Sequence, residues 1–313
     1  MIWLIGAGGM SVDYVKVLQA QKQDFIVVGR GELSAKHFED KTGHRVIVGG
    51  LVNYLSAFPL IPEAVIVSVG VEQLYNTTMQ LLEYGVKHIL VEKPGGLLLN
   101  EMEQLKDSAK ANDAKVFIAY NRRFYSSVIK ARELIELDGG VTSFNFELTE
   151  WSHVIGKLDK KPEVLAKWFL ANSTHVADLA FFLGGKPTEI TSYSSGTLDW
   201  HPTSSVFAGA GISDKGAIFN YGADWKSAGR WSVEMLTNKN RYVFRPMESL
   251  NIQARGSIKQ NVLHVDDTLD KEFKPGLFLQ VEQFINGNEV DLCSIEEQLS
   301  MFSVYNEMAS YEL

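Results

Sequence analysis

Short apolar runs alternate with helical patterns over the first 120 residues, and each run is followed by glycine or by polar residues. The runs predict strands at residues 2–5, 25–28, 46–48, 64–69, 89–91 and 116–119. Apolar residues at helical spacing predict helices at about 10–18, 73–84 and 100–112. Strands that are apolar throughout are buried on both faces. The pattern therefore predicts a doubly wound parallel sheet, the Rossmann type of α/β fold.

After Tyr120 the apolar residues begin to alternate with polar ones, which predicts a mostly antiparallel sheet with one exposed face. These strands are predicted at residues 142–150, 189–197, 204–212, 216–223, 231–237 and 241–245. Helices are predicted at about 126–136, 171–183, 276–286 and 294–310. We therefore divide the chain into a Rossmann domain, residues 1–120, and an α+β domain, residues 121–313.

Composition narrows the class of protein. A chain of 313 residues fits two ordinary domains, and a formal charge of −8 argues against general binding to nucleic acid or anionic membranes. No apolar run reaches the roughly 18 residues of a transmembrane helix. The N-terminus lacks the positive segment of a signal peptide. We expect a cytoplasmic protein with neither a nucleic-acid partner nor a membrane partner.

Metal-binding residues are sparse. Cys293 is the single cysteine, so it can form neither an internal disulfide nor a thiolate metal site, and we expect it to be buried as an apolar residue. The histidines other than His175 show no ligand spacing. We predict no metal.

A glycine-rich loop, Gly6-Ala7-Gly8-Gly9-Met10, separates the first predicted strand from the first predicted helix. In this context Gly6 permits a tight turn, and Gly8 lets the backbone approach a pyrophosphate at the helix N-terminus. Ser11 stands where the pattern has its third glycine, so we expect slightly looser packing of helix on strand. The alternative is a structural turn that binds no ligand.

The end of the second predicted strand bears on the choice of cofactor. Arg30 follows this strand, and Glu32 comes two residues later. An acidic residue here binds the ribose 2′-OH of NAD, whereas an arginine suits the 2′-phosphate of NADP. Because Arg30 comes first, we predict NADP(H) over NAD(H). The alternative is that Arg30 is a solvated surface charge.

Lys93 follows the strand predicted at residues 89–91, at the edge where open α/β sheets bind ligands. A lysine beside a nicotinamide and a substrate hydroxyl can carry the proton while the cofactor carries the hydride. By position alone, a surface lysine at a strand end is an equally good interpretation.

Four motifs occur in a fixed order along the chain. They are Gly6-Ala7-Gly8-Gly9-Met10, Val91-Glu92-Lys93-Pro94, Asn121-Arg122-Arg123-Phe124, and His175-Val176-Ala177-Asp178-Leu179 followed by Leu183-Gly184-Gly185. Together they resemble the Gfo/Idh/MocA oxidoreductase family, which includes glucose–fructose oxidoreductase and inositol dehydrogenase. The resemblance covers essentially the whole chain. It implies that the second domain binds substrate and forms a homodimer or homotetramer.

The resemblance also implies roles for individual residues. Lys93 would hydrogen-bond the reacting hydroxyl or carbonyl, the Lys93–Pro94 peptide would be cis as in some members, and His175 would be an acid/base beside the nicotinamide. Cofactor contacts are expected at Gly6, Ala7, Gly8, Gly9, Met10, Arg30, Ser68, Val69, Gly70, Glu92, Lys93 and Pro94. Substrate contacts are expected at Tyr120, Asn121, Arg122, Arg123, Trp151, Asn172, Thr174 and Asp178.

Two features of these motifs leave alternatives open. One of Arg122 and Arg123 is expected to contact substrate and the other to pair with an acid, and the sequence does not decide which. Many family members carry an aspartate four residues before the histidine, where this chain has Ala171. Proton transfer would then depend on Lys93, His175 or both.

The sequence thus predicts an NAD(P)-dependent dehydrogenase or reductase. Hydride would pass between nicotinamide and the carbinol or carbonyl carbon of a sugar, a sugar-like polyol or a nucleotide sugar. One alternative is a glycosidase that uses the cofactor without net redox change. Another is a cofactor-binding regulator of the same fold without catalysis, which Ala171 slightly favours and which Lys93 and His175 oppose.

Overall fold

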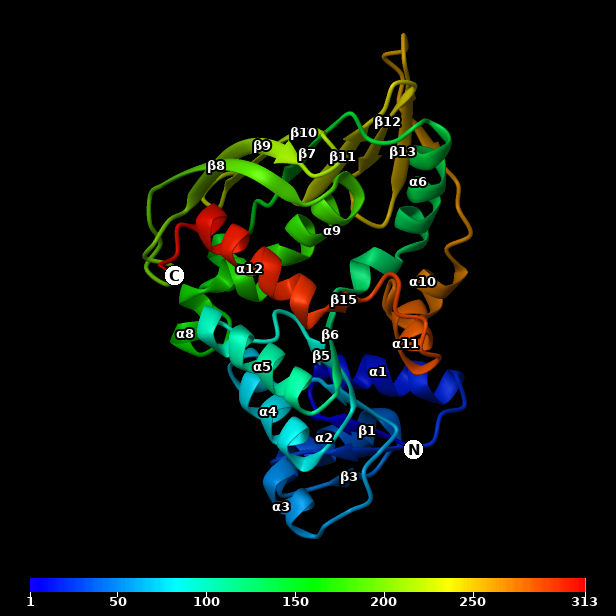
Figure 1. Ribbon diagram of the computed structural model, residues 1–313, viewed down its shortest axis with the longest axis vertical. Coiled ribbons are helices and arrows are strands. Elements are labelled where there is room, and N and C mark those ends of the chain that lie inside the picture. The colour runs from blue at the N-terminus through cyan, green and yellow to red at the C-terminus, as the bar shows by residue number, and fades with distance from the viewer. Residues whose placement is uncertain (313) are drawn as a thin grey trace. The chain divides into compact units, whose positions relative to one another are not determined.

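The computed structural model describes residues 1–312 and divides the chain into two compact units, coloured along the chain in Figure 1. The first unit comprises Met1–Asn121 and Leu269–Leu299. The second comprises Arg122–Thr268 and the residues from Ser300 onward. The sequence alone assigned all of residues 121–313 to the second domain, whereas residues 269–299 belong with the first unit.

The first unit is built on a seven-stranded sheet in the order β15-β6-β5-β4-β1-β2-β3. Its strands are β1 (Ile2–Ile5), β2 (Phe25–Val28), β3 (Val46–Ile47), β4 (Ala64–Val67), β5 (His88–Glu92), β6 (Lys115–Ala119) and β15 (Cys293–Ser294). Strands β1 to β6 are parallel, and all four residues of β1 and of β4 are buried. The predicted Rossmann sheet is confirmed.

Helices cover both faces of this sheet, because right-handed crossovers run from β1 toward β3 in one direction and toward β6 in the other. The helices are α1 (Gly9–Ala20), α2 (Glu32–Thr42), α3 (Gly50–Ser56), α4 (Leu74–Tyr84) and α5 (Leu99–Ala111), with a 3₁₀ turn η1 (Val71–Gln73). Helices α2 and α3 had no clear sequence signal. In α2 only Ala35 and Phe38 are buried, too few for a visible apolar stripe.

The segment Leu269–Leu299, here called the returning segment, completes the first unit. It contains α10 (Thr268–Glu272), α11 (Leu277–Ile285), β15 and the start of α12 (Ile295–Ala309). Helix α11 packs against α1, and β15 pairs antiparallel with β6 through Cys293 and Ile118. Cys293 is buried in this strand, as expected.

The second unit is built on an eight-stranded sheet in the order β14-β13-β12-β11-β7-β10-β9-β8. Its strands are β7 (Ser143–Glu147), β8 (Pro187–Ser195), β9 (Val206–Ser213), β10 (Ile218–Asp224), β11 (Ser232–Leu236), β12 (Asn240–Phe244), β13 (Leu250–Ala254) and β14 (Asn261–Leu263). All neighbours are antiparallel except β7 and β10. The prediction of a mostly antiparallel sheet is confirmed.

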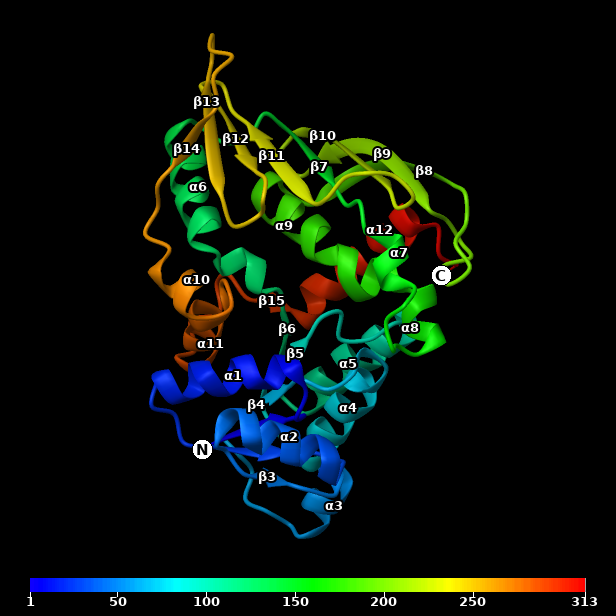
Figure 2. The ribbon, with the colours of Figure 1, turned by 180° about the vertical axis from the view of Figure 1, so that it is seen from behind.

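One face of this sheet packs against helix α9 (Thr174–Gly184), which contacts β7 and β11 (Figure 2). Phe181 of α9 packs edge-on against the rings of Phe144, Phe146 and Phe219 of the sheet. The other helical elements are η2 (Asn121–Phe124), α6 (Ser126–Leu137), α7 (Ser152–Ile155), α8 (Pro162–Ala166) and the π-helical turn η3 (Phe169–Ser173). Between residues 1 and 312 the structure has no helix with the length and apolar character needed to cross a membrane.

Candidate functional site

The carboxyl ends of the parallel strands gather the predicted residues of the first unit along one edge of its sheet. The strand register aligns Ile5 with Val67 and Val67 with Val91. Residues that follow these strands therefore emerge at the same edge, where open α/β sheets bind their ligands. They include Gly6 after β1, Ser68 after β4, Lys93 after β5 and Tyr120 after β6.

The turn after β1 requires glycine at position 6. Gly6 has φ of 120°, and a Cβ there would lie 2.3 Å from the carbonyl oxygen of Ser68. Ser11 ties helix α1 to the same segment, because its hydroxyl lies 3.1 Å from Ser68 Oγ and 3.3 Å from Ser68 O. The serine thus adds hydrogen bonds at the position where looser packing was expected.

The N-terminus of α1 suits the diphosphate of a dinucleotide. Gly8 is the N-cap and provides no side-chain cap, and both Gly8 and Gly9 are exposed, with open space for 4 Å around the point where a Cβ would lie. The first-turn N–H groups of a helix carry partial positive charge and bind phosphate groups. Ala7 and Met10 are partly exposed beside them. The loop therefore leaves open space at the helix N-terminus, where a pyrophosphate can approach the backbone.

Arg30 follows β2 at this edge. It is exposed, its side chain runs beside Gly50, and it forms no ion pair with any residue of the described range 1–312. Glu32, the competing candidate, is exposed as the first residue of α2. The structure thus leaves both charges accessible, so Arg30 fits a 2′-phosphate and the choice of cofactor remains a prediction.

Lys93 lies in a tight turn that ends β5. The Lys93–Pro94 peptide is cis, and Gly95 N–H donates to Glu92 O at 3.1 Å. Gln298, from the returning segment, donates its side-chain amide to Pro94 O at 3.1 Å. The turn that holds Lys93 is therefore fixed from both sides.

Glu92 is paired with Tyr14 of α1, whose hydroxyl donates to Glu92 Oε1 at 2.8 Å. Burial raises the pKa of Glu92, although Tyr14 and Lys93 act in the opposite direction. Burial, followed by the charge of Glu92, raises the pKa of Tyr14. The sequence gives no sign that Tyr14 bonds Glu92, because Tyr14 occupies an ordinary apolar position of an amphipathic helix.

The residues after β6 are held by the returning segment. Asn121 is buried and donates its side-chain amide to Pro275 O at 2.9 Å. With its amide oxygen turned toward them, Gln280 accepts from the backbone N–H groups of Tyr120 and Asn121, each at 3.2 Å. Tyr120 and Asn121 were both expected to contact substrate. Both side chains are buried, and Tyr120 is only 1% exposed.

In the second unit, His175 lies in the first turn of α9 and is partly exposed. Asp178, one turn later, forms a buried bidentate pair with Arg123, with bonds of 2.9 Å from Nε and 2.5 Å from Nη2. Arg123 is therefore the arginine that pairs with an acid. Thr174, also expected at the substrate, is buried and donates to Leu170 O at 2.8 Å.

Glu150, which follows β7, is a buried carboxylate of the second unit. One oxygen accepts from Asn172 Nδ2 at 2.8 Å and from Ser173 Oγ at 2.9 Å, and the other accepts from Arg230 Nη1 at 2.8 Å. Burial raises the pKa of Glu150, and Arg230, Asn172 and Ser173 oppose that rise. No acidic residue occupies position 171, but a carboxylate is present nearby from another element.

Arg122 and Arg230 both stack on Trp231. Their guanidinium carbons lie 4.7 Å and 4.1 Å from the centre of its ring, and Arg230 also lies 5.0 Å from the ring centre of Trp151. Trp151 is 50% exposed. The ring of His175 lies 6.3 Å from that of Trp231. The sequence pointed to Arg122 and Trp151 but not to Arg230 and Trp231, which lie much further along the chain.

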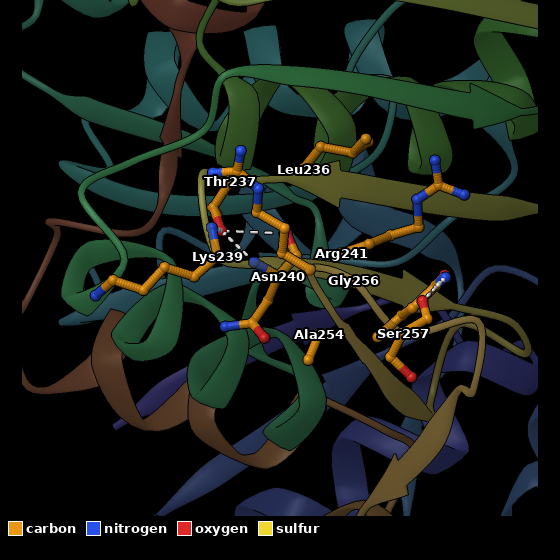
Figure 3. A pocket seen from close by; sticks show the side chains of 10 residues that line it. Leu236, Thr237, Lys239, Asn240, Arg241, Ala254, Gly256 and Ser257 are labelled. Carbon is orange, nitrogen blue, oxygen red and sulfur yellow. Dashed lines mark hydrogen bonds between the residues drawn. The ribbon is translucent and has the colours of Figure 1, made fainter.

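A separate pocket of about 260 Å³ lies in the eight-stranded sheet of the second unit, around the β11–β12 hairpin (Figure 3). Thr237 and Asn240 are hydrogen-bonded across the hairpin turn, and Arg241 and Arg255 line the pocket. None of the predicted site residues lines it. Within residues 1–312 no group of three or more histidine, cysteine or acidic side chains could hold a metal ion.

The sequence of the first domain decides the family. Residues 1–120 match the Gfo/Idh/MocA family, described as an oxidoreductase family with an NAD-binding Rossmann fold. This domain belongs to the Gfo/Idh/MocA family. The match confirms the resemblance for the first domain, and with it the expected NAD-binding Rossmann fold of an oxidoreductase family.

Comparison with known proteins gives a relative in sequence and several solved structures of similar fold. The chain is 26% identical over 140 residues to scyllo-inositol 2-dehydrogenase (NADP(+)) IolW of Bacillus subtilis (strain 168), covering 42% of this chain and 37% of the relative. The match thus spans little more than a third of that enzyme. Levoglucosan dehydrogenase in complex with NADH aligns with a TM-score of 0.79 at 16% identity, covering 99% of this chain and 95% of the other. UDP-N-acetylglucosamine 3-dehydrogenase GnnA of Acidithiobacillus ferrooxidans aligns with a TM-score of 0.76 at 15% identity, covering 99% and 96%.

Proposed function

We propose that the whole chain is a Gfo/Idh/MocA protein, an NAD(P)-dependent dehydrogenase or reductase acting on a CH–OH carbon of a sugar, a sugar-like polyol or a nucleotide sugar. The observation that carries the proposal is the position of Lys93 at the same sheet edge as the glycine loop. Relatives named as dehydrogenases of an inositol, of levoglucosan and of a nucleotide sugar support the substrate class.

The chain's own residues would bind the dinucleotide and handle the proton. Residues 6–10 hold the diphosphate at the N-terminus of α1, and the bound nicotinamide supplies or accepts the hydride. In reduction the Lys93 ammonium donates a proton from Nζ to the carbonyl oxygen. In oxidation the Lys93 amine accepts the proton of the hydroxyl. His175 assists as the second acid/base.

The proposed cofactor preference is NADP(H) over NAD(H). It is supported by Arg30, which is accessible, has no ion-pair partner within residues 1–312 and can bind a 2′-phosphate through two parallel hydrogen bonds. The relatives do not decide the question, because one is named for NADP⁺ and another is described with NADH.

The test compares two lysines at opposite ends of one strand. Lys93→Met should lower turnover about 10²–10⁴-fold, the usual contribution of a positioned acid/base, while dinucleotide binding stays largely intact. Lys87, at the amino end of β5, is exposed and far along the strand from the ligand edge, so Lys87→Met serves as the control. Full activity of Lys93→Met on a turned-over sugar would refute the proposal.

The same assay separates the alternative functions. Dinucleotide binding without turnover over a panel of neutral and acidic sugars would favour a regulator. Turnover without net consumption of NAD(P)H would favour a glycosidase that oxidises and re-reduces one sugar.

A further inference from the structure

We propose that the side chains around Trp231 form a subsite for an anionic group of the substrate, a carboxylate or a phosphate carried on a sugar. The inference rests on the proposed function and specifies its substrate class. The subsite lies wholly within the second unit and consists of Arg122, Arg230, Trp231 and Trp151, beside His175.

The charges of this cluster do not balance. Glu150 is the carboxylate that contacts the cluster, and both of its oxygens are taken by Asn172, Ser173 and Arg230. Glu150 acts on Arg122 through its charge, but no ion pair joins the two among the described residues. Asp178 is likewise engaged by Arg123. Arg230 is paired with Glu150 and Arg123 with Asp178, so the charge of Arg122 has no carboxylate paired with it in the cluster.

Two buried donors of the cluster lack acceptors. Arg122 Nε and Trp231 Nε1 are buried, and neither has a hydrogen-bond partner among the described residues. Glu248 lies near enough to act on Arg122 electrostatically, but it is exposed and forms no ion pair with it. Buried donors are nearly always paired in native proteins, so two unpaired donors on stacked side chains indicate a ligand that brings acceptors.

Stacking also sets the geometry of the two arginines. A guanidinium stacked on an indole is fixed in its plane, so less entropy is lost when it forms hydrogen bonds. Its planar set of donors matches the two oxygens of a carboxylate or phosphate. Arg230 is fixed in the same way between Trp151 and Trp231. Trp151, half exposed, offers a flat apolar face to the rest of a sugar ring.

The test measures binding to the chain loaded with NADP(H) by isothermal titration calorimetry. The probes are D-glucose, D-glucuronate, D-glucose 6-phosphate and UDP-glucose, which separate a carboxylate from a phosphate and from a diphosphate. At least one anionic probe should bind tenfold or more tightly than D-glucose. Arg122→Gln should reduce that preference about tenfold, equivalent to about 1.4 kcal/mol.

Two variants control for damage to the fold. Arg122→Lys keeps the charge but loses the paired geometry, so it should retain part of the preference. Arg255→Gln removes an exposed arginine at the hairpin pocket of Figure 3 and should leave the preference unchanged. The inference is overturned if no anionic probe binds more tightly than D-glucose, or if Arg122→Gln weakens neutral and anionic probes equally. Either result would leave the proposed dehydrogenase activity standing, because that activity is tested separately by Lys93→Met.

Discussion

Tyr14 in helix α1 donates a hydrogen bond of 2.8 Å to Glu92, the residue directly before Lys93. This contact links the helix that begins at the glycine loop to the strand end that carries the proposed acid/base. Glu92 is held there at a cost, because burial disfavours its charged form and raises its pKa. The Tyr14–Glu92 pair therefore affects both the stability of the first unit and the position of Lys93.

We expect the melting temperature of Glu92→Gln to rise relative to that of the wild type as the pH increases. A carboxyl group whose folded-state pKa is raised contributes most below its ordinary pKa of 4.5, and the contribution is lost as the pH rises through the folded pKa. Glutamine has no charge to lose, and its amide oxygen can still accept from Tyr14. The difference in melting temperature between variant and wild type should be small near pH 4 and grow toward pH 8, as measured by calorimetry. A constant difference would contradict this assignment.

Two glycines of the loop should respond differently to alanine. Gly6→Ala places a Cβ 2.3 Å from Ser68 O at a positive φ, so it should lower the free energy of unfolding by about 3 kcal/mol or more. Gly8→Ala meets no atom within 4 Å and should leave the melting temperature nearly unchanged. Because its methyl group lies where a diphosphate would approach, Gly8→Ala should still weaken dinucleotide binding about tenfold or more. Unchanged binding by a folded Gly8→Ala would remove the loop from the proposed cofactor site.

Arg30→Ala should separate the two cofactors. Loss of a charge-assisted pair with the 2′-phosphate, about 1.5–3 kcal/mol, should weaken NADPH binding about 10–100-fold and leave NADH binding unchanged. Arg45→Ala is the matched control, since Arg45 is an exposed arginine of the same unit that has no ion-pair partner within residues 1–312. Fluorescence titration of both cofactors gives the answer. Equal affinity of the wild type for NADPH and NADH would refute the preference.

The first domain was predictable because its strands are buried on both faces. Strands such as β1 and β4 need apolar residues at every position, and the loops between them carry the glycine pattern. The return of residues 269–299 to this unit left no such signal. The strand β15 is only two residues long, and the docking of α11 on α1 depends on tertiary contacts that periodicity does not encode.

The site was predictable only where a single motif carries it. Lys93, His175 and Arg122 each stand within a short motif, so position along the chain marked them as candidates. The pair of Glu150 and Arg230 joins residues 80 positions apart, and each reads as an ordinary surface charge in the sequence. Trp231 reads as a core aromatic. What distinguishes these residues is their burial and their mutual contacts, which only the folded chain defines.

Two of the four histidines in the second unit, His175 and His201, offer a matched comparison of catalysis and stability. His175 is partly exposed at the start of α9, whereas His201 is fully buried, with its ring nitrogens 2.6 Å from Ser204 O and from Tyr311 Oη. Burial lowers the pKa of His201, so it is held as a neutral structural group. His175→Gln should lower kcat at a nearly unchanged melting temperature, because it removes an acid/base from a partly exposed position.

His201→Gln should show the opposite effect. Gln cannot place donor and acceptor where the imidazole places them, so Ser204 O loses the donor and the Tyr311 hydroxyl loses the acceptor that His201 supplies, at about 1–3 kcal/mol for each group. The melting temperature should therefore fall while kcat per folded molecule stays at the wild-type value. Thermal unfolding and active-site-normalised kinetics measure both quantities. If His175→Gln instead lost stability and kept its kcat, His175 would be the structural histidine and proton transfer would depend on Lys93 alone.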